Sequence, residues 1–155
     1  MAVGALLCTL GTCSPRISVM EQVQTLGALR VATVNSPTTY YEGPAGPTGF
    51  EYELALALAE QLGVKLELVV AASAPETLEM VKTGRAHFAA AGVSITPLRT
   101  LKLRFTQPVL SVVPQLVYRR GGTRPDNANE VGEGLVVPEA SAASEHLAEV
   151  RAKAP

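Results

Sequence analysis

The stretch GFEYELALALAEQLG, residues 49–63, decides the fold class of this chain. Its large apolar residues recur every four positions, which is the spacing of one face of an α-helix, at Phe50, Leu54, Leu58 and Leu62. We therefore predict a helix whose Phe50, Leu54 and Leu58 pack in the core. Gly63 is expected to end this helix, because glycine readily takes the left-handed conformation of a C-terminal cap.

Short apolar segments on either side of this helix have the composition of buried strands. Residues 29–34 (LRVATV) precede it and residues 64–70 (VKLELVV) follow it, and both are rich in β-branched residues. Residues 73–76 (SAPE) then form a capping box that begins a helix running to residue 82. Residues 86–90 are predicted as a third strand, so the order is β-α-β-α-β.

This alternation predicts an α/β fold with a mostly parallel sheet and helices on both faces. Ligands of such sheets bind beyond the carboxyl ends of the strands. Those ends are the loops at residues 35–42, 91–96 and 138–141. We expect the ligand site to lie there.

The rest of the chain predicts further elements. Thr96 and Pro97 begin a short helix that runs to about residue 103. Strands are expected at residues 112–119, which end at Gly121-Gly122, and at residues 135–137. A last helix begins at Ser141 and runs to about residue 152. The predicted division is a leader at 1–27, a first lobe at 28–112, a crossover strand at 113–122 and the start of a second lobe at 123–155.

Composition limits the function classes. The chain has 155 residues and a net charge of -1, without the clustered basic surface that nucleic-acid binding requires. Its two cysteines, Cys8 and Cys13, lie in a small, apolar segment typical of a signal peptide. Cys13 is either a lipidation site that anchors the protein to a membrane or an ordinary cysteine removed on cleavage. We expect no cofactor, no metal site and no catalysis, because the folded part lacks a cysteine nucleophile and the acids Glu51 and Glu53 are expected on a solvated helix face.

Two motifs carry a family resemblance. Residues 49–54 (GFEYEL) and residues 91–99 (AGVSITPLR) resemble, in order and spacing, the signature and the ligand-binding turn of the family 3 extracellular solute-binding proteins. The resemblance covers residues 28–150 and implies a two-lobed, exported binding protein. It also implies that this chain ends inside its second lobe, without the strand that returns to the first.

The second motif has suitable chemistry for a carboxylate. A loop that enters a helix offers backbone N–H groups, here from Gly92 onward, and the positive end of the helix dipole. The hydroxyl of Ser94 adds a donor, and Arg99 can place two N–H groups on one carboxylate. Thr96 is expected either as a ligand contact or as the N-cap of its helix.

Further positions complete or weaken the expected site. Tyr40 covers the ligand or packs on neighbouring prolines, and Ser141 contacts the ligand or caps its helix. Asn35 stands where amino-acid receptors commonly place an acid that holds an ammonium group, and Ala140 stands where a glycine is common. His87, in a strand, is expected as a packed or edge residue.

Residues 35–42 (NSPTTYYE) and 115–121 (QLVYRRG) carry a narrower resemblance, to the solute-binding-like domain of the membrane-bound lytic murein transglycosylase F family. It implies a non-catalytic sensor, periplasmic or associated with the outer membrane, for an amino acid or cell-wall peptide ligand. It also implies that a lysozyme-like catalytic domain lies beyond residue 155. The alternative is an amino-acid receptor that delivers its ligand to a membrane permease of an ABC transporter.

Overall fold

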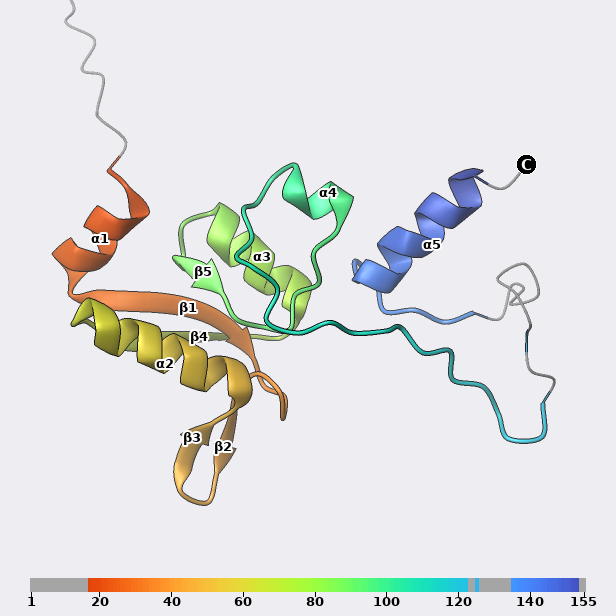
Figure 1. Cartoon of the computed structure of the whole chain (residues 1–155), viewed down its shortest axis with the longest axis horizontal. Coiled ribbons are helices and arrows are strands. Elements are labelled where there is room, and N and C mark those ends of the chain that lie inside the picture. The colour runs from red at the N-terminus through yellow and green to blue at the C-terminus, as the bar shows by residue number, and fades with distance from the viewer. Residues whose placement is uncertain (1–16, 123–124, 126–134, 154–155) are drawn as a thin grey trace, which may run out of the picture.

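A three-stranded parallel sheet forms the centre of the computed structural model, which describes residues 17–122, 125 and 135–153 (Figure 1). The strands are β1 (Ala28–Val34), β4 (Lys65–Ala71) and β5 (Phe88–Ala89), in the order β4-β1-β5. β1 pairs in parallel with both neighbours. The predicted α/β lobe is therefore confirmed, although the third strand is shorter than expected.

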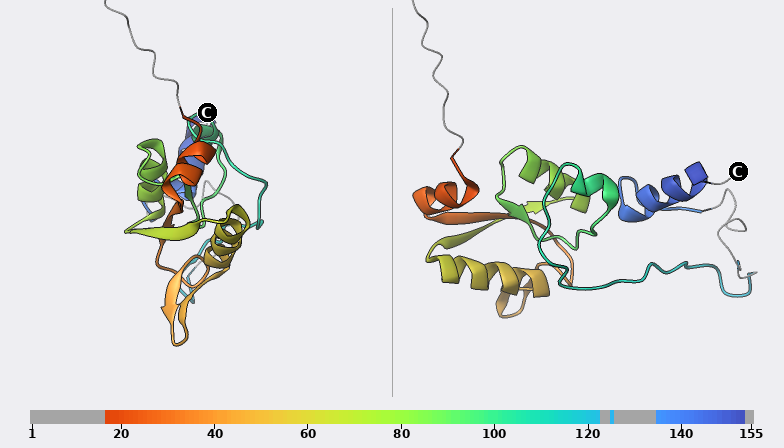
Figure 2. Two further views of the ribbon diagram at one scale, coloured as in Figure 1. Left: turned by 90° about the vertical axis from the view of Figure 1, so that its left-hand side faces the viewer. Right: turned by 45° about the horizontal axis from the view of Figure 1, so that its top comes forward.

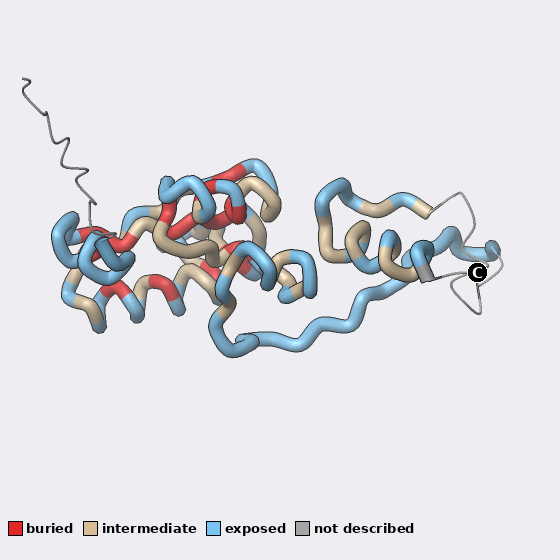
Figure 3. Tube along the Cα trace, turned by 90° about the horizontal axis from the view of Figure 1, so that it is seen from above, coloured by how far each residue is buried: buried red, intermediate tan, exposed pale blue. Residues whose placement is uncertain are grey.

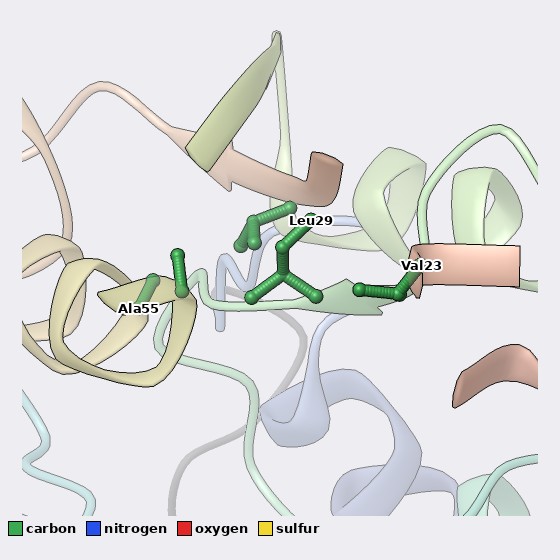
Figure 4. Close-up of a cluster of buried hydrophobic side chains, with 5 residues drawn as sticks. Val23, Leu29 and Ala55 are labelled. Atoms are coloured by element: carbon green, nitrogen blue, oxygen red, sulfur yellow. The ribbon is translucent and has the colours of Figure 1, made fainter. Parts of the chain in front are cut away.

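Helices cover both faces of the sheet and bury two apolar clusters. On one face, α1 (Val19–Leu26) and α2 (Phe50–Leu62) contribute Val23, Ala55 and Ala59, which pack with Leu29 and Val31 of β1 (Figure 4). On the other face, α3 (Ala74–Lys82) contributes Met80, which packs with Ala32 and Ala71. The residues of β1 divide between the two faces because side chains alternate along a strand.

α2 forms where it was predicted, but the predicted buried face is wrong. Ala55 and Ala59 are buried, whereas Phe50, Leu54 and Leu58 are exposed. Apolar residues occur around most of this helix, so their spacing did not indicate which face packs. The small alanine side chains face the sheet, and α2 can therefore lie close to β1.

The loop predicted at residues 35–49 contains an antiparallel hairpin of β2 (Tyr41–Gly43) and β3 (Gly46–Thr48). Gly49 joins this hairpin to α2 with φ of 137°, and a Cβ there would lie 2.4 Å from the carbonyl oxygen of Thr39. The N–H of Tyr52 donates to that same carbonyl. The glycine of the first motif is therefore required so that the start of α2 can contact residues 38–40.

Beyond the lobe, the predicted strands do not form. After α4 (Pro97–Thr100), residues 104–122 run away from the sheet with mostly exposed side chains (Figures 1 and 3). The predictions of strands at 112–119 and 135–137 are wrong for this structure, because neither segment lies beside a strand with which it could pair. α5 (Ala142–Lys153) confirms the last predicted helix and returns the chain to α4 (Figure 2).

α1 lies within the segment that was predicted as a leader. Ser18 and Glu21 form a capping box at its start, and its Val23 is buried beneath β1. The predicted boundary at residue 28 therefore leaves α1 outside the lobe, although Val23 of α1 belongs to the core of the lobe. The signal-peptide and lipidation predictions fall on residues 1–16 and concern Cys8 and Cys13, which lie outside the described residues.

Candidate ligand-binding site

The turn at residues 91–99 connects β5 to α4 at the carboxyl end of the sheet, where a ligand was predicted. Gly92 has a left-handed φ of 63°. Its N–H, one of the predicted ligand donors, donates to the Glu51 carboxylate at 2.8 Å. Glu51 lies in the first turn of α2 and belongs to the first sequence motif. A side chain that was predicted on a solvated face thus connects the two motifs.

Arg99 is the charged residue of this turn. Its side chain is 9% exposed, and its Nε lies 2.9 Å from Oε1 of Glu145 in α5. Nη1 and Nη2 donate to the carbonyl oxygens of Ser94 and Ala140, each at 3.1 Å. The guanidinium therefore joins α4, the 91–96 loop and the start of α5.

Thr96 has one of the two roles that the sequence allowed and a further contact besides. Its hydroxyl oxygen accepts the N–H of Arg99 at 3.3 Å, which makes it the N-cap of α4. The same hydroxyl donates to Oε2 of Glu145 at 2.5 Å. One carboxylate is thus bound through both oxygens, by the hydroxyl of Thr96 and by the guanidinium of Arg99.

The surroundings of Glu145 favour its charged form. Burial would raise the pKa of this carboxyl, but the hydrogen bonds from Thr96 and Arg99 and the positive charge of Arg99 outweigh burial, and the pKa lies below its ordinary value. The side chain is 19% exposed. The turn therefore holds a carboxylate in its ionised form.

Tyr40 lies away from this cluster. Its hydroxyl donates to Glu42 at 2.6 Å, and its ring lies 5.9 Å from that of Tyr52 in a tilted arrangement. The hydrogen bond to Glu42 raises the pKa of Tyr40, because it favours the protonated phenol. Asn35 forms a backbone bridge with Tyr40 and is exposed. Tyr40 thus packs on a tyrosine of α2, whereas the expected packing partners were prolines.

Ser141 begins α5, where its hydroxyl accepts the N–H of Ser144 at 3.1 Å. This contact matches the capping role that was one of its two predicted roles. Ser141 is also the neighbour of Ala140, whose carbonyl accepts from Arg99. The structure thus brings Ser94, Thr96 and Arg99 together beside the start of α5, and it does not bring Tyr40 to them.

Glu51 and Glu145 were missed as members of this cluster. The signal for Glu51 was its place in the first motif, at the positive end of α2. The signal for Glu145 was its place in the first turn of α5, four residues after the capping serine. Pattern alone could not indicate that either acid reaches the 91–99 turn, because both contacts span more than forty residues of sequence.

A cavity of about 340 Å³ lies beside the cluster, between α3 and α4. Arg99 and Glu145 line one side of it, and Leu78, Lys82 and Lys102 line others. The other predicted site residues do not line it: Tyr40, Gly92, Ser94, Thr96 and Ser141. The cavity therefore meets the predicted site at Arg99.

A comparison with family models matches residues 29–151 to the bacterial extracellular solute-binding proteins, family 3. The match includes both motifs and the start of α5. The chain belongs to this family.

The solute-binding chain is also similar to curated proteins named membrane-bound lytic murein transglycosylase F. It is 42% identical to the one from Saccharophagus degradans over 86% of its own length, and 43% identical to the one from Pseudomonas syringae pv. syringae over 94%.

The solute-binding chain spans less than a third of the length of these relatives, 27% of the first and 30% of the second.

Solved structures of the same fold include an ancestral amino acid-binding protein described as a precursor of cyclohexadienyl dehydratase. It is 33% identical, with a TM-score of 0.56, over 60% of this chain and 41% of that chain. An ancestral cyclohexadienyl dehydratase is 31% identical, with a TM-score of 0.55, over 63% of this chain and 41% of that chain.

His87 lies at the edge of the solute-binding lobe and has a structural contact. Its Nδ1 accepts the N–H of Arg30 at 3.0 Å, next to the pairing of β1 with β5. Burial, and then the charge of Arg30, lower the pKa of His87. The ring therefore remains neutral near pH 7 and can accept this hydrogen bond, as expected for a packed or edge residue.

Among the helices that the structure describes, none is long and apolar enough to cross a membrane.

Proposed function

We propose that this chain is a non-catalytic sensor domain that binds a small carboxylate ligand, an amino acid or a cell-wall peptide, at the 92–99 turn. The observation that carries the proposal is the partly buried Arg99, which with Thr96 already holds one carboxylate through both of its oxygens. Hydrogen bonds between a guanidinium and a carboxylate are stronger than those between neutral groups. Gly92, Ser94, Tyr40 and Ser141 are proposed as further ligand contacts.

The regulatory role rests on the relatives. Proteins named membrane-bound lytic murein transglycosylase F are about 40% identical to this chain over the aligned residues and are more than three times as long. We infer that the chain is the sensing part of such an exported enzyme, that residues 28–112, 113–122 and 123–155 are its first lobe, its hinge and the start of its second lobe, and that the glycan-cleaving part is a separate domain. The expected location is the periplasm or the outer membrane, with Cys13 either lipidated or removed with the signal peptide.

A second candidate is an amino-acid receptor of a transporter. The similarity to an ancestral amino acid-binding protein favours it. The two candidates differ in ligand: a murein sensor should prefer the murein tripeptide, and a receptor should prefer a free amino acid. Isothermal titration of the 155-residue chain with both ligands separates them.

The test of the site is Arg99→Ala. Hydrogen bonds to charged groups contribute about 1.5–3 kcal/mol, so the variant should bind the preferred ligand roughly 10-fold to 100-fold more weakly. Lys102→Ala is the matched control, because Lys102 is a neighbouring exposed cation. The proposed site is wrong if Arg99→Ala retains the affinity of the unchanged chain while far-ultraviolet circular dichroism shows the same fold.

A further inference from the structure

Both donor groups of the proposed site are occupied by carboxylates of the chain itself. Glu51 accepts the N–H of Gly92, and Glu145 accepts from Thr96 and Arg99. The two acids come from α2 and α5, which lie on opposite sides of the turn in the sequence. A ligand carboxylate would need the same N–H and O–H groups.

The Arg99 guanidinium is largely occupied. Each of its three nitrogens already donates one N–H group, to Glu145, Ser94 and Ala140, so three of its five N–H groups are in use. The side chain is only 9% exposed. A ligand carboxylate can take the position at Nε and at the Thr96 hydroxyl only after Glu145 has moved away.

The attachment of α5 is suited to such a movement. Among the described residues, its segment makes polar contacts with the lobe at two side chains, Thr96 and Arg99. None of the described residues of α5 is buried, in contrast to the lobe (Figure 3). The two apolar clusters of the lobe contain no residue of α5, so α5 can separate without disturbing the core.

We propose that Glu145 is an internal competitor: it occupies the carboxylate position at Thr96 and Arg99, and a ligand binds by displacing it and releasing α5. This inference rests on the proposed function. It adds that ligand binding releases α5 from the lobe, so the position of α5 differs between the empty and the filled site. It also implies that the apparent affinity of the chain is lower than that of the open site, by the fraction of molecules in which Glu145 is away.

Acetate is the simplest probe, because it carries the carboxylate and little else. We would titrate it against the 155-residue chain at constant ionic strength and follow the Nε–H resonance of Arg99 by NMR. In Glu145→Ala, this resonance should reach half of its change at an acetate concentration about tenfold lower than in the unchanged chain. Glu145→Gln keeps the size of the side chain but not its charge, and should fall between the two.

Glu149→Ala is the matched control, since Glu149 lies one turn further along α5 and the described hydrogen bonds of Thr96 and Arg99 do not involve it. It should behave as the unchanged chain. A second measurement is amide hydrogen exchange at residues 142–153, which acetate should accelerate in the unchanged chain and in Glu149→Ala but not in Glu145→Ala.

The possible failures are distinct. If Arg99 responds to acetate at the same concentration with and without Glu145, or if α5 exchange is unchanged when the site is filled, the competitor role is wrong and the carboxylate site stands. If the Arg99 resonance of Glu145→Ala does not respond to acetate, the turn does not take a carboxylate, and both the proposed function and this inference are wrong.

Discussion

Residues 19–91 and residues 104–153 are held in place by different interactions. The first region has apolar clusters on both faces of a sheet, and its last buried residue is Ala91. The second has none of its described residues buried, and its polar attachment to the lobe runs through Arg99 and Thr96 (Figure 3). A core stabilises the lobe by removing apolar area from water, whereas an ion pair is open to competition. The lobe is therefore the stable scaffold and α5 the movable part.

The largest expected difference between the regions is the effect of removing an apolar side chain. Leu29 is 3% exposed within β1, and Leu29→Ala should lower the free energy of unfolding by about 2–5 kcal/mol, because it leaves a cavity in the core. Val117 is 89% exposed, and Val117→Ala should change it by about 0.5 kcal/mol or less. Urea denaturation followed by circular dichroism measures both. Similar effects would mean that residues 104–122 pack as part of the lobe in solution.

A smaller effect is expected from strain at the junction of loop and helix. Gly49→Ala should cost about 1–3 kcal/mol for its backbone conformation alone, and the added Cβ also overlaps the Thr39 carbonyl. Gly63→Ala is the matched control, because Gly63 also has a positive φ but no atom lies within 4 Å of the added Cβ. It should cost about 1–2 kcal/mol, without the added overlap.

Both glycines lie within residues 19–91, so this pair tests whether that region unfolds as a single unit. If residues 19–91 unfold as one unit, Gly49→Ala should shift the same cooperative transition as Leu29→Ala, whichever spectroscopic signal is followed. A change confined to the 35–49 loop would show that the hairpin is not part of the cooperative unit.

The sequence predicted the lobe well because its local signals agree. Caps at Ser73 and Gly63, β-branched strands and a helical spacing all indicate the same β-α-β-α-β order, and the structure has it. The packing face of α2 was wrong, because alanine and leucine are both apolar and only the closeness of β1 selects Ala55 and Ala59. Residues 112–119 have strand-like composition, but a strand also needs a partner, and composition does not supply one.

The candidate site was predicted in part. The donors Gly92, Thr96 and Arg99 follow from a turn that enters a helix, which is local information. The acceptors Glu51 and Glu145 reach that turn from distant segments, so they depend on the tertiary structure. The sequence therefore predicted the donor groups of the turn and not the carboxylates that occupy them.

The smallest expected effect is a loss of α5 attachment in acid, and it tests the polar side of the comparison. The pKa of Glu145 lies below the ordinary 4.5. Its contribution is therefore complete above pH 4.5 and is lost as the pH falls through the lowered pKa. Arg99 faces this carboxyl, and Glu79, Lys82 and Lys102 line the adjacent cavity. Amide exchange at residues 142–153 should accelerate as the pH falls below 4.5, once corrected for the intrinsic pH dependence of exchange.

Glu145→Gln separates this effect from others that acid causes. Hydrogen bonds to the backbone and then the side chain of Ser18 lower the pKa of Glu21, so acid also weakens the cap of α1. In Glu145→Gln, α5 exchange should already be fast at neutral pH and should change little with acid, whereas α1 should respond as in the unchanged chain. If α5 remained equally protected in both proteins at every pH, the attachment of α5 would not depend on the charge of Glu145, and the contrast between a core-held lobe and an ion-paired helix would be wrong.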